Sequence, residues 1–107
     1  MFYKYIVNIH NVQSLNEVRE QIDLLDSQIV SLLKERSVFV AEAARFKKDR
    51  DEVKAPERVE AVIKKVRLLA EQNNVSQSLV EQVYRTMITC FIQEEMDEHS
   101  RINEKNA

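Results

Sequence analysis

Three charged side chains interrupt apolar helical patterns in this 107-residue chain, and their types suggest chemistry on a small anion. Arg36 lies at the edge of an apolar stripe that includes Leu33 and Val40. Lys47 follows eleven residues later, so on one continuous helix both cations would point along nearly the same line, about 16 Å apart. Glu95 closes a second apolar stripe near the C-terminus. Two cations and a carboxylate in one cavity suit a small dianionic substrate held by charge-assisted hydrogen bonds.

Each of these residues also has an ordinary structural interpretation. The stems of Arg36 and Lys47 could cover the core while their charged heads reach water. Glu95 could lie at a fraying helix end, or form a structural salt bridge to either cation. Arg19 and Arg58 each stand near a predicted helix start, where a solvated surface arginine is the default. The residue types alone leave these alternatives open.

Other kinds of site are disfavoured by the composition. No Ser-His-Asp or Cys-His pattern argues for a covalent nucleophile, and the absence of glycine removes phosphate-binding loops. The lone Cys90 with two distant histidines cannot form a tetrahedral zinc site. We assign Cys90, Met87 and Tyr84 to core packing, and predict that His10 and His99 are solvated.

Long helices must position these side chains. Apolar spacing predicts a helix from Ser14 to about Asp49, with Ser14 as N-cap and Glu17 completing a capping box. Residues 48–55 are predicted to be a fraying helix end and a loop. A second helix runs from Pro56 to about Gln72, where an Asn-Asn pair ends it.

A third helix is predicted from the Ser76 cap to about Arg101. We therefore expect an extended arm at 1–13, a helical domain at 14–101 and a polar tail at 102–107. The fold class is all-α, because a chain without glycine and with one proline lacks the usual turns of β-proteins.

The first helix would be about 50 Å long, which exceeds what a compact chain of this length can cover. This predicts an intertwined homodimer of three-helix chains. The net charge of −2 disfavours nucleic-acid binding. No run approaches the ~20 apolar residues of a membrane span, and a single cysteine fits a reducing compartment, so a cytoplasmic protein is expected.

Three segments of the chain resemble the all-helical chorismate mutases and their relatives, the isochorismate pyruvate lyases. They are LNEVREQIDLLDSQIVSLLKERSVFVAEAARFK (15–47), VKAPERV (53–59) and MITCFIQEE (87–95). The first contains V-R-x-x-I-D-x-L-D, then L-L-x-E-R and a terminal lysine. The resemblance implies an intertwined dimer whose two active sites each draw residues from both chains.

The resemblance also implies roles for five residues. Arg19 would reach across to a substrate carboxylate of the partner's site, and Arg36 would bind the other carboxylate region within its own chain. Lys47 would donate to the ether oxygen of the breaking C–O bond, Glu95 would contact the same oxygen, and Arg58 would support carboxylate binding at the pocket mouth.

Two positions distinguish possible substrates. Many bacterial mutases carry Asp at the place of Ala55 and Glu at the place of Val59, and both carboxylates are missing here. APERV resembles the isochorismate pyruvate lyases, whereas Glu95 departs from the glutamine expected in them. The expected activity is rearrangement of chorismate to prephenate, a pericyclic reaction for which we expect no metal and no organic cofactor. The alternatives are isochorismate pyruvate lyase, 4-amino-4-deoxychorismate mutase and a non-catalytic helical dimer.

Overall fold

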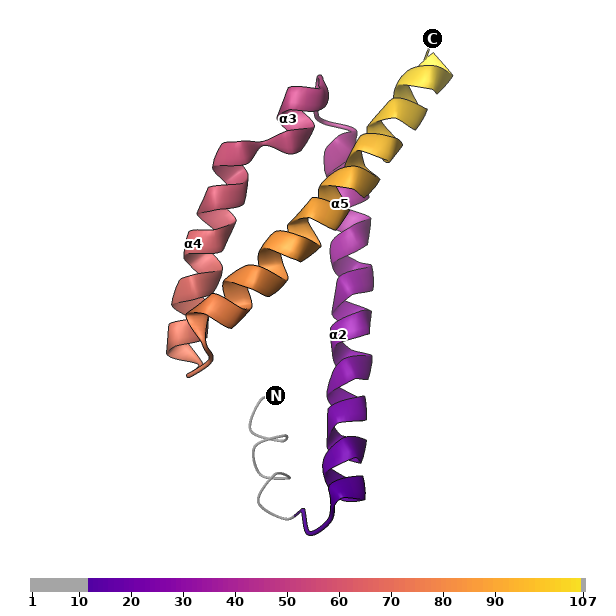
Figure 1. Cartoon of the computed structure of the whole chain (residues 1–107). Helices are drawn as coiled ribbons and strands as arrows, with labels where there is room; N and C mark the ends of the chain where they lie inside the picture. Colours follow the sequence, from indigo (N-terminus) through magenta and orange to yellow (C-terminus); the bar gives the residue numbers. More distant parts are fainter. Residues whose placement is uncertain (1–11, 107) are drawn as a thin grey trace. The chain divides into compact units, whose positions relative to one another are not determined.

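The computed structural model describes residues 12–106, and this part of the chain is built from helices without a strand. The elements, shown in Figure 1, are α2 (Leu15–Ala44), α3 (Arg50–Lys54), α4 (Pro56–Gln72) and α5 (Gln77–Asn106). The all-α prediction is confirmed for the described part. The predicted N-terminal arm lies almost entirely outside it. None of the helices within 12–106 combines the length and apolarity of a membrane span.

The chain divides into two units, residues 1–36 and 37–107. In the first unit, α2 starts where the sequence predicts it. The backbone N–H of Glu17 donates to Ser14 Oγ at 3.1 Å, and the Glu17 carboxylate accepts from the backbone N–H of Gln13 at 2.6 Å. These bonds satisfy backbone donors that a helix N-terminus otherwise leaves unpaired.

The end of α2 differs from the prediction. The helix stops at Ala44 instead of continuing to about Asp49. Bonds from the backbone N–H of Arg45, Phe46 and Lys47 to carbonyls three residues earlier tighten its last turn. Asp49 then caps the short helix α3, because its side chain accepts from the Glu52 N–H at 2.9 Å. Residues 48–55 were expected to be a fraying helix end and a loop, but Asp49 with an acidic residue three positions later is a helix-start signal, and α3 forms there.

Helix α4 has the predicted boundaries. Pro56 occupies its first turn, where a missing N–H costs nothing. At the other end, Asn74 has φ 57°, in the left-handed region. The N–H of Val75 bonds to the carbonyl of Ala70, and that of Asn74 to Glu71, which is the Schellman arrangement. Asparagine tolerates this conformation better than most residues, so it takes the place that glycine usually fills.

The core lies in the second unit, where α3 and α4 pack against α5. Figure 1 shows α4 and α5 running in opposite directions from the turn at 73–76. The buried apolar side chains are Ala44, Val53, Ile63, Val66, Ala70, Ile88, Phe91 and Met96. This core therefore holds α3, α4 and α5 together.

Two predictions about α5 are wrong. The helix continues to Asn106, beyond the expected end near Arg101. Cys90 is exposed rather than packed, because the buried face of α5 passes through Ile88 and Phe91 and position 90 points well away from that line. Met87 and Tyr84 are half-buried, so they contribute to packing only in part.

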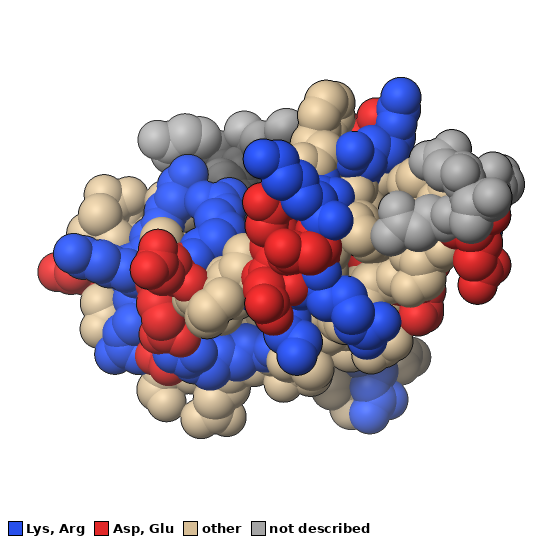
Figure 2. Space-filling view, turned by 90° about the horizontal axis from the view of Figure 1, so that it is seen from above, with Lys and Arg blue, Asp and Glu red and all other residues tan. Residues whose placement is uncertain are grey.

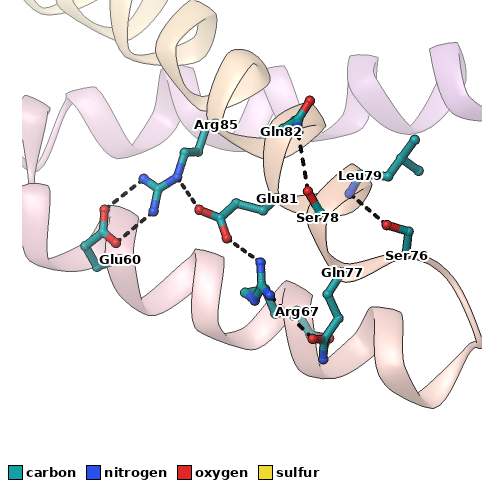
Figure 3. Close-up of polar contacts among 9 residues, drawn as sticks. All are labelled: Glu60, Arg67, Ser76, Gln77, Ser78, Leu79, Glu81, Gln82 and Arg85. Carbon is teal, nitrogen blue, oxygen red and sulfur yellow. Dashed lines mark hydrogen bonds and ion pairs between the residues drawn. The ribbon is translucent and has the colours of Figure 1, made fainter.

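A polar network joins α4 to α5 at the surface (Figure 3). Arg85 makes a two-pronged contact with the Glu60 carboxylate at 2.9 Å for both bonds, and its Nε donates to Glu81 at 2.7 Å. Glu81 also accepts from Arg67. Hydrogen bonds from Arg85 hold the pKa of Glu60 below its ordinary value, and those from Arg85 and Arg67 do the same for the pKa of Glu81. The network therefore favours the ionised carboxylates.

The face seen in Figure 2 carries basic and acidic side chains intermixed. This agrees with a chain of 16 Lys and Arg and 18 Asp and Glu. Neither the basic nor the acidic side chains cover that face without interruption.

Candidate active site

Lys47 and Glu95 form an ion pair inside the second unit.

 What distinguishes this pair from the surface pairs is its burial. The Glu95 side chain is 7% exposed and that of Lys47 is 25% exposed, whereas both side chains of the Arg85–Glu60 pair are more than 40% exposed. Lys47 Nζ contacts Glu95 Oε2 directly. The structure therefore brings together two of the five residues singled out from the sequence.

The elements that carry the pair explain its position. Glu95 lies on α5, one turn beyond Phe91 and next to Met96, on the face that packs into the core. Lys47 lies just beyond the end of α2, in the turn that precedes α3. Lys47 was expected within the first helix, and that expectation is wrong because α2 ends at Ala44.

Burial makes the contact with Lys47 important for Glu95. Apart from the Lys47 contact, Glu95 Oε2 is buried and accepts no hydrogen bond within the described residues. Burying a carboxylate is costly unless a cation or a hydrogen-bond donor accompanies it. The ammonium of Lys47 supplies the accompanying cation. Because the Lys47 side chain is 25% exposed, it can also contact a ligand.

The other three candidate residues have different surroundings. Arg58 is exposed near the start of α4 in the second unit. Arg19 and Arg36 lie on α2 in the first unit, where Arg19 is exposed and Arg36 is half-buried. The buried ion pair is thus made by residues of the second unit alone.

One residue of this region was misjudged from the sequence. His99 is 6% exposed, so the prediction that it is solvated is wrong. Its Nε2 lies 2.7 Å from the backbone oxygen of Lys47. The signal was present in the spacing, because His99 follows Glu95 by four residues and so continues the same buried face of α5.

Metal binding finds no support in the described part of the chain. Within residues 12–106, no group of three or more His, Cys, Asp or Glu side chains is arranged to hold a metal ion. The pair of Lys47 and Glu95 offers one cation and one carboxylate, which suits hydrogen bonding to an oxygen-rich organic ligand.

Comparison with known proteins identifies the class of protein to which this fold and site belong. Residues 18–96 match the family described as chorismate mutase type II. The chain belongs to this family.

Two curated relatives agree with that assignment. The chain is 35% identical to an isochorismate pyruvate lyase of Pseudomonas aeruginosa over 82 residues, which cover 77% of this chain and 81% of the relative. It is 26% identical to a chorismate mutase of Methanocaldococcus jannaschii over 78 residues, which cover 72% of this chain and 79% of the relative.

Proposed function

We propose that the chain is a chorismate mutase that rearranges chorismate to prephenate. The observation that carries this proposal is the buried Lys47–Glu95 pair in a member of the type II chorismate mutase family. The relative from M. jannaschii, named a chorismate mutase, supports the same activity. The reaction is pericyclic, so C–O cleavage and C–C formation proceed together and need neither a protein nucleophile nor a cofactor.

The protein's contribution is to position the substrate and to stabilise developing charge. We assign Arg19, Arg36 and Arg58 to the substrate carboxylates, which folds the enolpyruvyl side chain over the ring. Lys47 donates a hydrogen bond to the ether oxygen as negative charge builds there. A well-placed donor of this kind contributes about 3–4 kcal/mol to transition-state stabilisation.

Glu95 can act in this site in two ways. A protonated Glu95 donates a second hydrogen bond to the ether oxygen, whereas an ionised Glu95 only accepts and serves to orient Lys47. If it is the donor, turnover at saturating substrate falls as the pH rises, and Glu95→Gln flattens that loss because an amide donates at every pH. Superimposable pH profiles for the two proteins would leave Glu95 with the orienting role.

We further infer that the active enzyme is a homodimer in which a second copy covers α2. Leu15, Ile22, Ile29 and Leu33 follow one face of α2, and each is more than a third exposed in the single chain. An apolar stripe of this length on one helix is typical of an interaction surface. Measurement of the molar mass in solution by light scattering tests the assembly, and a monomer would refute it. We place this enzyme in the cytoplasm, where its unpaired Cys90 would stay reduced.

A second candidate is isochorismate pyruvate lyase, which yields salicylate and pyruvate and would place the chain in salicylate biosynthesis. The 35% identical relative from P. aeruginosa carries that name. The same two carboxylates and the same ether oxygen would be bound, and the scissile bond would break with a hydrogen transfer instead of C–C formation.

Product analysis with each substrate separately decides between these activities. The purified chain is incubated with chorismate and, in a second reaction, with isochorismate, and the products are separated by chromatography. Prephenate from chorismate supports the mutase, and salicylate with pyruvate from isochorismate supports the lyase. Lys47→Ala is the matched control, because it should abolish most of either activity. No turnover of either substrate would refute both proposals.

A further inference from the structure

Helix α5 contacts Lys47 at two separate points. Glu95 contacts the ammonium at the tip of the side chain, and His99, one helical turn further on, contacts the backbone oxygen of the same residue at 2.7 Å. Both α5 residues are 6% exposed. The two contacts therefore hold Lys47 at its backbone and at its charged end.

The contact with His99 has a defined direction. A carbonyl oxygen only accepts, so Nε2 of His99 carries the hydrogen and donates. Two other hydrogen bonds secure this turn: the Lys47 N–H donates to the Ala44 carbonyl at 3.4 Å, and the Lys48 N–H donates to the side-chain carboxylate of Glu52. The His99 bond ties this turn to α5 across 52 residues of sequence.

The position of the Lys47 backbone decides where its ammonium can reach. A lysine side chain is long and flexible, so its tip covers a wide volume unless its base is fixed. A turn beyond a helix end fixes a backbone less firmly than the helix does. The buried His99 side chain on α5 adds a constraint at the carbonyl of Lys47, which the bonds to the N–H groups of Lys47 and Lys48 do not hold.

We propose that His99 is a positioning residue that holds the backbone of Lys47 so that the ammonium faces Glu95 and the bound substrate. This inference rests on the proposed function for its kinetic consequences. The hydrogen bond itself is independent of which substrate is bound.

The kinetic test is a double-mutant cycle between His99 and Lys47. His99→Leu removes the donor and should lower kcat by tenfold or more, with a smaller change in KM. In the Lys47→Ala background the same substitution should change kcat by less than twofold, because there is no ammonium left to position. His99→Gln keeps an N–H donor and should recover most of the lost turnover.

Met96→Ala is the matched control on the same helix. Met96 is buried beside Glu95, and its thioether has no hydrogen-bond donor for the Lys47 carbonyl, so the effect of its substitution on kcat should be equal in the two backgrounds. An equal loss from His99→Leu in both backgrounds would show that His99 acts only through general stability, and would overturn the proposal.

Hydrogen exchange provides a readout that needs no substrate. Backbone amides of residues 46–49 should exchange faster in His99→Leu than in the native protein, and at the native rate in His99→Gln. Unchanged exchange in His99→Leu would overturn the proposal even if turnover falls. If the native protein turns over neither chorismate nor isochorismate, the proposed function fails while the exchange experiment still decides whether His99 holds the Lys47 turn.

Discussion

Replacing Lys47 by alanine separates the catalytic and structural roles of the buried ion pair. Breaking a fully buried pair from one side costs about 3–5 kcal/mol, because the remaining charge is left uncompensated. Lys47 is 25% exposed while Glu95 is 7% exposed, so solvent reaches the pair from the lysine side. We therefore expect Lys47→Ala to lower the free energy of unfolding by about 2 kcal/mol. If Lys47 is the donor to the ether oxygen, turnover should fall by about 10²–10³-fold.

The double variant Lys47→Ala/Glu95→Gln distinguishes the two effects. The neutral amide removes the uncompensated charge, so the free energy of unfolding should return to within about 1 kcal/mol of the native value. Turnover should stay low, because no ammonium faces the substrate. Urea denaturation measures the first quantity and the product assay at saturating substrate measures the second.

Lys48→Ala is the matched control for this experiment. Lys48 is the next residue in the chain and is exposed, so its substitution should change stability and turnover little. Recovery of turnover together with stability in the double variant would refute the reasoning and leave the pair with a structural role. Native turnover in Lys47→Ala would do the same.

Two further predictions concern assembly and pH. Mixing Arg19→Ala chains with Arg36→Ala chains should restore one active site per heterodimer, giving at most about a quarter of native activity at equal mixing; proven subunit exchange without recovery would exclude sites shared between chains. The pKa values of Glu60 and Glu81 lie below the ordinary value of 4.5 because they accept hydrogen bonds from Arg85. This lowering stabilises the fold above about pH 4.5, and the contribution is lost as pH falls through the lowered pKa values. Arg85→Met should therefore destabilise the protein more at pH 7 than at pH 3, as measured by urea denaturation, and an equal effect at both pH values would contradict the sign of the linkage.

Local signals in the sequence were sufficient to predict most helix boundaries. The start of α2 at Leu15 and of α5 at Gln77 follow from the Ser14 and Ser76 caps, whose hydroxyls accept from backbone N–H groups three residues later. Pro56 marks the first residue of α4. These features depend on neighbours within one helical turn, which is why they can be recognised without knowledge of the fold.

The end of α2 and the surroundings of Lys47 required the tertiary structure. The charged residues after Ala44 are as compatible with a continued helix as with a helix end. The position at which α2 ends therefore depends on Asp49, which starts α3, and on Val53, which is buried in the second unit. Packing between distant segments decides whether the helix continues or ends, because the local helix propensities of these residues are nearly balanced.

The sequence by itself determined that this protein is helical, that it belongs with the chorismate mutase-like chains and that Lys47 and Glu95 are unusual charges. The helical fold class and the unusual charges need only composition, periodicity and residue type, whereas the family follows from the resemblance of segments 15–47, 53–59 and 87–95. Only the tertiary structure decided that the two residues meet as a buried pair and that His99 holds the backbone of Lys47 from the same helix. The physical reason is that these contacts join positions about fifty residues apart, and the burial that makes them significant is created when α5 packs against the segments before it.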